Sequence, residues 1–192
     1  TYDESRFSPL KDINDSNVAG LGLAWSFETG TNRGHETTPI VVDGMMFISA
    51  PWSVVFALNP ITGEKIWSFD PQADKAWARN ACCDVVNRGV AVWEDQVIIA
   101  TIDGRLISLN KNSGEVNWDV LTIDKSKPYT ITGAPRIIDG KIIIGNGGGE
   151  YGVRGYISAY DVQDGSMLWR FFNSFFISGA HRIFGCMQQR CL

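Results

Sequence analysis

The chain has 192 residues, a formal net charge of −4 and 44% hydrophobic residues, a composition that suits one domain with a substantial core. The mild acidic excess argues against nucleic acid as a partner, because phosphate binding requires clustered Lys and Arg. No apolar run approaches the ~20 residues of a membrane-spanning helix, so we expect no membrane span. The polar segment at residues 1–6 carries no signal peptide, which leaves an exported origin open.

Short apolar runs separated by Asp-Gly-like turns occupy most of the chain. In chain order they predict strands at residues 39–42, 45–48, 54–58, 65–69, 89–92, 96–100, 135–138 and 141–144. No segment sustains the 3.6-residue apolar period of an amphipathic helix. The sequence therefore predicts an all-β fold.

An internal repeat organises these strands. Trp67, Trp118 and Trp169 lie 51 residues apart, each following an Asp/Asn-x-x-x-Gly turn, and a weaker copy ends near Trp25. Repeated units of four short strands are typical of β-propeller blades. Residues 20–172 hold about three blades, whereas a propeller closes with about four to eight, so we interpret the chain as part of a larger ring. We expect each of the three repeat tryptophans to be buried between neighbouring blades.

The last stretch of the chain departs from this pattern. It has no Asp-Gly turn, and it combines several Phe residues with Cys186 and Cys191, whose spacing is not the Cys-x-x-Cys-His of haem attachment. We therefore divide the chain into a partial propeller, residues 1–172, and an atypical tail, residues 173–192.

The adjacent pair Cys82-Cys83 is the sharpest local feature. Neighbouring Cα atoms are only ~3.8 Å apart, so a bond between these sulfurs closes a strained ring. Two free or separately bridged cysteines are the alternative, and the dipeptide alone does not decide between them. A zinc site is excluded, since the chain has two His and neither lies at ligand spacing from a cysteine pair.

A glycine-rich run at residues 145–155 follows a predicted strand. Gly148 and Gly149 would let backbone approach a ligand closely, and the Glu150 carboxylate could bind a hard cation. The run is not a phosphate-binding loop, because no Lys-Ser/Thr and no helix follow it. The alternative is an interstrand loop with a solvated glutamate.

Three polar segments precede the first strand of successive blades. They contain Glu36, the Cys82 run with Arg88, and Thr132. Taken alone, Glu36 is more typical of a solvated surface. Because the starts of the first strands meet at one end of a propeller axis, we expect the three segments to cluster there.

These motifs together resemble the pyrroloquinoline quinone (PQQ)-dependent alcohol dehydrogenases, over residues 1 to about 172. The motifs are the Cys-Cys-Asp-x-Val-Asn-Arg-Gly run at 82–89, the glycine-rich run at 145–156 and the Trp-ending repeat. The resemblance implies an eight-bladed propeller with tryptophan-docked blades, and a Cys82–Cys83 disulfide against one face of PQQ. It further implies that the cofactor is contacted by Glu36, Arg88, Thr132 and the Gly148-Gly149 backbone. Glu150 would be a ligand of Ca²⁺ or a lanthanide.

By the same resemblance, the function is oxidation of small alcohols to aldehydes in the bacterial periplasm, with an electron acceptor such as cytochrome c. The family's catalytic Asp, its remaining metal ligands and the Trp over the second quinone face come later than this chain extends, so we expect no activity from the chain alone. A non-enzymatic propeller scaffold, such as an outer-membrane assembly lipoprotein, is the alternative. A scaffold would require neither the Cys82-Cys83 pair nor the Glu150 segment.

Overall fold

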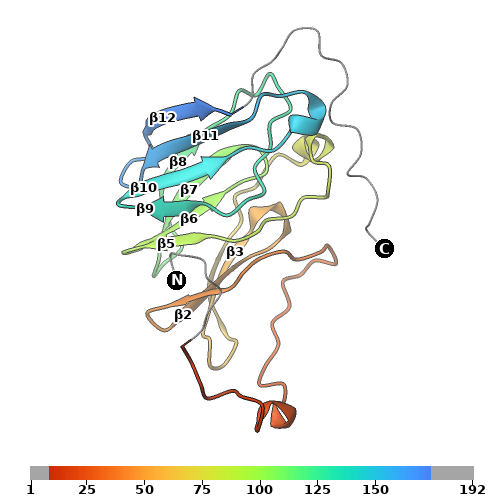
Figure 1. Cartoon of the computed structure of the whole chain (residues 1–192), viewed down its shortest axis with the longest axis vertical. Helices are drawn as coiled ribbons and strands as arrows, with labels where there is room; N and C mark the ends of the chain where they lie inside the picture. Colours follow the sequence, from red (N-terminus) through yellow and green to blue (C-terminus); the bar gives the residue numbers. More distant parts are fainter. Residues whose placement is uncertain (1–8, 174–192) are drawn as a thin grey trace.

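The computed structural model describes residues 9–173, which form three four-stranded antiparallel sheets arranged in chain order (Figure 1). Blade 1 contains β1 (Ile40–Val42), β2 (Met45–Ser49), β3 (Val55–Leu58) and β4 (Lys65–Phe69). Blade 2 contains β5 (Ala91–Trp93), β6 (Gln96–Ala100), β7 (Arg105–Asn110) and β8 (Val116–Leu121). Blade 3 contains β9 (Arg136–Ile138), β10 (Lys141–Gly145), β11 (Tyr156–Asp161) and β12 (Met167–Phe172). The predicted all-β blades are confirmed.

The helical elements of the described residues are four short 3₁₀ turns. They are η1 (Val18–Gly20), η2 (Pro51–Ser53), η3 (Lys75–Asn80) and η4 (Gly149–Tyr151). None of the described helices is long and apolar enough to cross a membrane. The tail cysteines Cys186 and Cys191 lie outside the described residues, as does all of the predicted tail except residue 173.

Positive-φ residues and asparagine side-chain hydrogen bonds close the hairpins. Asp43 and Gly44 join β1 to β2 with φ of 49° and 73°, the positive values that a two-residue hairpin turn requires. The β3–β4 turn uses Asn59, whose side chain accepts hydrogen bonds from the backbone N–H groups of Ile61 and Thr62. The strands alternate with these turns because Asp, Asn and Gly tolerate conformations that the flanking β-branched residues do not.

A repeated tryptophan contact joins blade 1 to blade 2, blade 2 to blade 3, and the segment around Trp25 to blade 1. In each contact an indole Nε1–H donates to a backbone carbonyl of the following repeat, while the ring lies directly over that repeat's turn glycine. The three contacts are Trp25 with Pro60 O (3.1 Å) over Gly63, Trp67 with Lys111 O (2.9 Å) over Gly114, and Trp118 with Val162 O (3.1 Å) over Gly165. Acceptors and glycines recur at the 51-residue period of the sequence.

The burial prediction holds for only part of the tryptophan set. Trp67 is buried and Trp118 is half-buried, but Trp169 on β12 is 45% exposed. The prediction for Trp169 was wrong because no blade follows β12 among residues 9–173, so the ring has no turn glycine to cover.

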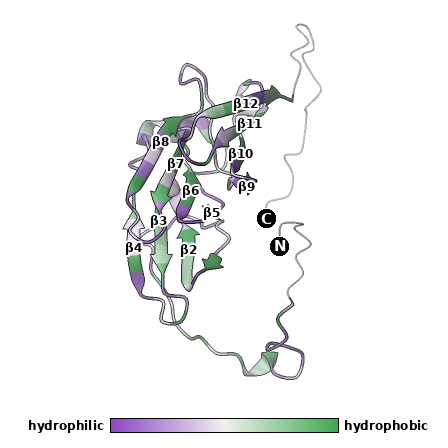
Figure 2. Cartoon of the chain, turned by 90° about the vertical axis from the view of Figure 1, so that its left-hand side faces the viewer, coloured by the Kyte–Doolittle hydropathy of each residue, from purple (hydrophilic) through white to green (hydrophobic). Residues whose placement is uncertain are grey.

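The core lies between blades and within their middle strands. One buried cluster joins blades 1 and 2 through Phe47, Trp67 and Ile107, and another joins blades 2 and 3. In Figure 2, β2 and β3 are mostly hydrophobic, whereas β4 carries hydrophilic segments. The blades therefore bury apolar surface mainly against one another.

One ion-pair cluster also links blades 1 and 2. The Lys111 side chain is only 8% exposed, and its Nζ lies 2.7 Å from Asp43 Oδ2 and 3.5 Å from Asp95 Oδ1. The hydrogen bond with Asp43 is the main cause that raises the pKa of Lys111. The same residue therefore connects two hairpin turns through its side chain and accepts the Trp67 indole through its carbonyl.

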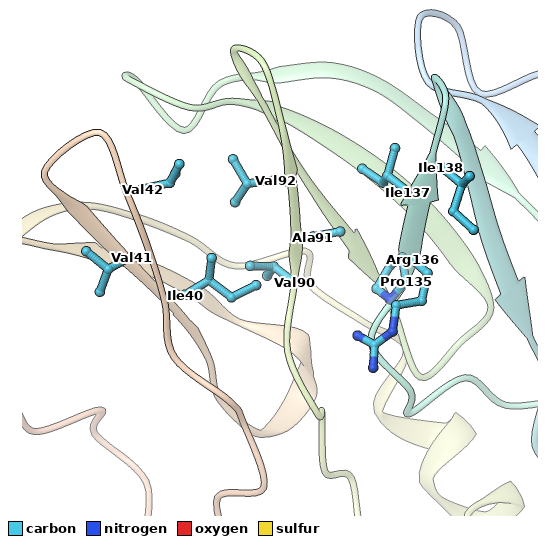
Figure 3. Close-up of a pocket in the computed structure, with 10 residues that line it drawn as sticks. All are labelled: Ile40, Val41, Val42, Val90, Ala91, Val92, Pro135, Arg136, Ile137 and Ile138. Atoms are coloured by element: carbon cyan, nitrogen blue, oxygen red, sulfur yellow. The ribbon is translucent and has the colours of Figure 1, made fainter. Parts of the chain in front are cut away.

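The innermost strands β1, β5 and β9 lie side by side and line an apolar hollow of about 590 Å³ (Figure 3). Ile40 and Val42 of β1 pack in one cluster with Val90 and Val92 at β5. These strands mark the side of the molecule that faces the propeller axis. The segments that lead into them carry the predicted site residues.

Candidate functional site

Three predicted site residues from three different blades meet at one point. The Arg88 guanidinium places Nη2 2.7 Å from Glu36 Oε2, and its Nη1 donates a hydrogen bond of 2.6 Å to Thr132 Oγ1. Side chains of Arg88 and Glu36 are 46% and 43% exposed. The group therefore presents a cation that incoming ligands can reach.

Backbone hydrogen bonds tie the same three segments together. The Arg88 N–H donates to the Thr132 carbonyl at 3.0 Å, and the Thr38 N–H donates to the Arg88 carbonyl at 3.4 Å. Gly89 has φ of +133°, where a side chain would be strained, so glycine is required directly after the arginine. The three lead-in segments thus form a continuous rim at one end of the inner strands.

The cysteine pair lies next to Glu150. The hydrogen bond with Cys83, partial desolvation and the hydrogen bond with Glu150 together raise the pKa of the Cys82 thiol to about 12. Both cysteines are free and exposed in this structure. The vicinal disulfide implied by the resemblance is therefore not shown, and it stays a prediction.

An ion pair secures the loop that carries the cysteines. Asp84, directly after Cys83, has φ of 72° and pairs with the Arg33 guanidinium. Arg33 also lies 5.7 Å from the centre of the Trp52 ring. The cysteine loop is therefore connected to the segment that leads into β1.

The glycine-rich run forms the fourth part of the rim. Gly147 pairs with Thr130, which brings this run beside the segment that holds Thr132. Gly148 has φ of +99°, and a Cβ there would lie 2.3 Å from the Pro128 carbonyl oxygen, so only glycine fits. At Gly149 a Cβ would meet nothing within 4 Å, so the backbone faces open space. Glu150 follows, exposed, within the turn η4.

Comparison with known proteins identifies the fold family. Residues 1–181 match the PQQ family described as the glucose/ethanol/alcohol dehydrogenase β-propeller domain. The chain belongs to this family. The resemblance predicted from the motifs is confirmed.

Relatives in this family are bacterial alcohol dehydrogenases. The chain is 54% identical over 173 residues to quinohemoprotein alcohol dehydrogenase ADH-IIG of Pseudomonas putida, covering 90% of this chain and 24% of that protein. It is also 54% identical over 163 residues to a 1-butanol dehydrogenase (cytochrome c) of Thauera butanivorans, covering 83% of this chain and 24% of that protein. The chain spans about a quarter of the length of these relatives.

Solved structures agree with the fold. The Pseudomonas putida ADHIIG structure superposes with a TM-score of 0.88 at 54% identity, over 90% of this chain and 25% of that one. A europium-containing methanol dehydrogenase gives 0.85 at 40% identity, over 89% and 30% of the two chains. The likeness to BamB of Moraxella catarrhalis, 0.50 at 21% identity over 71% and 36%, shows the fold alone.

The rim residues fit part of a site for a flat, anionic quinone. Arg88 supplies a cation, Thr132 supplies a hydroxyl, and the open backbone at Gly149 allows close approach. For a cation such as Ca²⁺ the fit is partial, because Ca²⁺ takes ~6–8 oxygen ligands. The Gly148 carbonyl already accepts hydrogen bonds from the Tyr151 and Val153 N–H groups, and the Gly149 carbonyl accepts one from Gly152. The Glu150 carboxylate is the anionic ligand that this run offers. Residues 9–173 hold no group of three or more His, Cys, Asp or Glu that could bind a metal.

The supporting residues were not predicted from the sequence. Asn87 is buried and lies between the cysteine pair and Arg88, and Ser53 and Thr37 complete the hydrogen-bonded layer beneath the rim. The available signal was an amide residue, Asn87, placed between two valines and an arginine. A buried amide in this position requires partners.

Proposed function

We propose that this chain is a section of a PQQ-dependent alcohol dehydrogenase and that its rim residues form one wall of the quinone site. The observation that carries the proposal is the Arg88 guanidinium, held between Glu36 and Thr132 where three blades meet. The family match and the relatives named as alcohol dehydrogenases support it. Bound PQQ would supply a two-electron oxidant for conversion of an alcohol to an aldehyde.

Each rim residue then has a role toward the cofactor. Arg88 would bind an oxygen of the anionic quinone, with Glu36 keeping the guanidinium oriented and Thr132 adding a hydroxyl. The Cys82–Cys83 pair would cover one face of the ring system, with the Gly148-Gly149 backbone beside it. Glu150 would contribute one carboxylate to a Ca²⁺ or lanthanide ion.

The proposed metal and electron acceptor follow the names of two relatives, and the proposed location follows the family resemblance. The europium-containing methanol dehydrogenase supports a lanthanide as an alternative to Ca²⁺. The relative named 1-butanol dehydrogenase (cytochrome c) supports a cytochrome c as electron acceptor. We place the protein in the bacterial periplasm, an oxidising compartment that suits a disulfide.

Cofactor binding tests the proposal directly. PQQ is titrated against the chain while intrinsic tryptophan fluorescence is recorded, in the presence of Ca²⁺. Arg88→Ala should weaken binding about 10- to 100-fold, the value of a charge-assisted hydrogen bond of about 1.5–3 kcal/mol. Lys65→Ala, which removes the same charge from outer strand β4, should leave binding unchanged. Equal affinities for the chain and Arg88→Ala would refute the proposal.

Activity provides the second test. We expect no dye-linked alcohol oxidation by the 192-residue chain with PQQ and Ca²⁺, because the rim supplies neither a catalytic base nor the full set of Ca²⁺ ligands. One wall should also bind PQQ only weakly, since apolar cofactor surface stays in water. A longer chain with the remaining blades should be active, and Glu150→Ala in that protein should abolish turnover. Turnover by the 192-residue chain in proportion to added PQQ would contradict this assignment.

The oxidation state of the cysteine pair is a third test. We expect Cys82 and Cys83 to be joined in a non-reduced periplasmic preparation. Alkylation without reductant, followed by mass spectrometry of the peptide, distinguishes the states. Two alkylated thiols on that peptide would reject the bond.

A further inference from the structure

Asn87 is a buried polar residue beneath the rim whose side chain makes three hydrogen bonds. The residue is 1% exposed, and its Nδ2 donates to Ser53 Oγ at 3.2 Å and to the Ala100 carbonyl at 2.9 Å. Its Oδ1 accepts from the Gly89 N–H at 3.1 Å, and its carbonyl accepts from Ser49 Oγ at 3.4 Å. One side chain thus joins the β2–β3 corner of blade 1 to strand β6 of blade 2.

The corner that receives Asn87 is strained. Trp52 and Ser53 have φ of 66° and 62°, values that cost a non-glycine residue about 1–3 kcal/mol. The Trp52 N–H donates to the Val85 carbonyl at 2.9 Å, two residues before Asn87. The strained corner and the segment before Arg88 therefore stabilise each other. Positive φ values at two non-glycine residues, Trp52 and Ser53, point to a functional constraint.

Arg88 requires a support of this kind. Its ion pair with Glu36 is half exposed, and exposed pairs fix geometry weakly because solvent screens them. The position of the guanidinium is set instead by its backbone, whose N–H and C=O bond to Thr132 and Thr38. Asn87 fixes the residues on both sides of that backbone, through its own carbonyl and through Gly89.

We propose that Asn87, seated on the strained Ser53, is the positioning residue that holds Arg88 across the three blades. This inference rests on the proposed function, in which Arg88 contacts the quinone. Asn87 does not reach the ligand itself, because it is buried beneath the rim. It acts by keeping the Arg88 backbone in register with Thr132 and Thr38.

Hydrogen exchange measured by NMR on the 192-residue chain tests this without any cofactor. Asn87→Ala should speed exchange of the Arg88 and Thr38 amides ~10-fold or more, because the local opening free energy falls. The amide of Ile107, in the central strand β7, should change ~3-fold or less. Equal acceleration at all three amides would assign Asn87 a general structural role and overturn the inference.

Ser53 supplies a milder variant should Asn87→Ala fail to fold. Ser53→Ala keeps the strained backbone but removes the acceptor, so it should speed exchange at Arg88 while leaving Ile107 unchanged. Thr62→Ala, in the exposed β3–β4 turn, is the matched hydroxyl control and should affect neither amide. Unchanged exchange at Arg88 in Ser53→Ala would contradict the proposal.

A double-mutant cycle for PQQ affinity separates this inference from the proposed function. Asn87→Ala should weaken binding at least ~5-fold when Arg88 is present and not at all in an Arg88→Ala chain, the coupling expected of residues that act through one another. If the Arg88→Ala chain binds PQQ as tightly as the unmodified chain, the proposed function fails. The amide hydrogen-exchange experiment then still tests whether Asn87 positions Arg88. Equal losses in both backgrounds would show that Asn87 does not act through Arg88.

Discussion

The turn glycines that receive a tryptophan should be intolerant of a single methyl group, and Gly114 offers the sharpest case. A Cβ at Gly114 would lie 2.7 Å from Trp67 Cε3 and 2.8 Å from Cδ2. The residue also has φ of +75°. Gly114→Ala therefore combines backbone strain with displacement of a buried ring.

Gly44 separates these two effects. It has φ of +73°, and a Cβ there would meet nothing within 4 Å. Gly44→Ala should cost only the left-handed penalty of about 1–2 kcal/mol. Gly114→Ala adds about 1–3 kcal/mol of overpacking and about 1 kcal/mol for a weakened Trp67–Lys111 hydrogen bond. We therefore expect a total loss of about 3–6 kcal/mol in the free energy of unfolding.

Urea denaturation followed by circular dichroism measures both variants, with the midpoint shift converted through the common m-value. The tryptophan emission of Gly114→Ala should also move to longer wavelength, because the Trp67 ring becomes more exposed to water. Losses that agree within ~0.5 kcal/mol for the two variants would refute the reasoning, since ring displacement would then contribute nothing.

Two further predictions concern the blade contacts. Trp67→Ala should cost about 3–5 kcal/mol of unfolding free energy, because the ring is buried, whereas Trp169→Ala should cost less than ~1 kcal/mol at its exposed position; similar losses in thermal denaturation would contradict the docking assignment. The pKa of Lys111 is raised by its hydrogen bond with Asp43. Its stabilisation is therefore complete below the ordinary lysine value of 10.5 and is lost as pH rises through the higher folded value, so Asp43→Asn should flatten that alkaline loss in thermal melts.

The blades could be predicted from sequence because their signals are local. Strands at 65–69 and 96–100 match β4 and β6 residue for residue, since a turn residue flanks each apolar run. The 51-residue period also indicated the docking of Trp67 and Trp118, because for each of them a following repeat supplies the turn glycine that the ring covers. Grouping of Glu36, Arg88 and Thr132 followed from their equivalent positions before β1, β5 and β9.

The support beneath the rim could not be predicted, because it depends on contacts between distant segments. Nothing in the local pattern indicates that Ser53 adopts a left-handed conformation or that it accepts a hydrogen bond from Asn87. Exposure of Trp169 was missed for a related reason. Its environment depends on residues beyond its own repeat, so its own motif does not determine its burial.

Each docking tryptophan precedes its glycine in the chain, so the contacts have a direction in time as well as in space. Trp67 is synthesised 47 residues before Gly114, and Trp118 stands 47 residues before Gly165. At a translation rate of ~5–20 residues per second, ~2–10 s pass between synthesis of each tryptophan and synthesis of the glycine that its ring covers. During most of synthesis the newest blade therefore carries one large indole ring whose covering glycine has not yet been made.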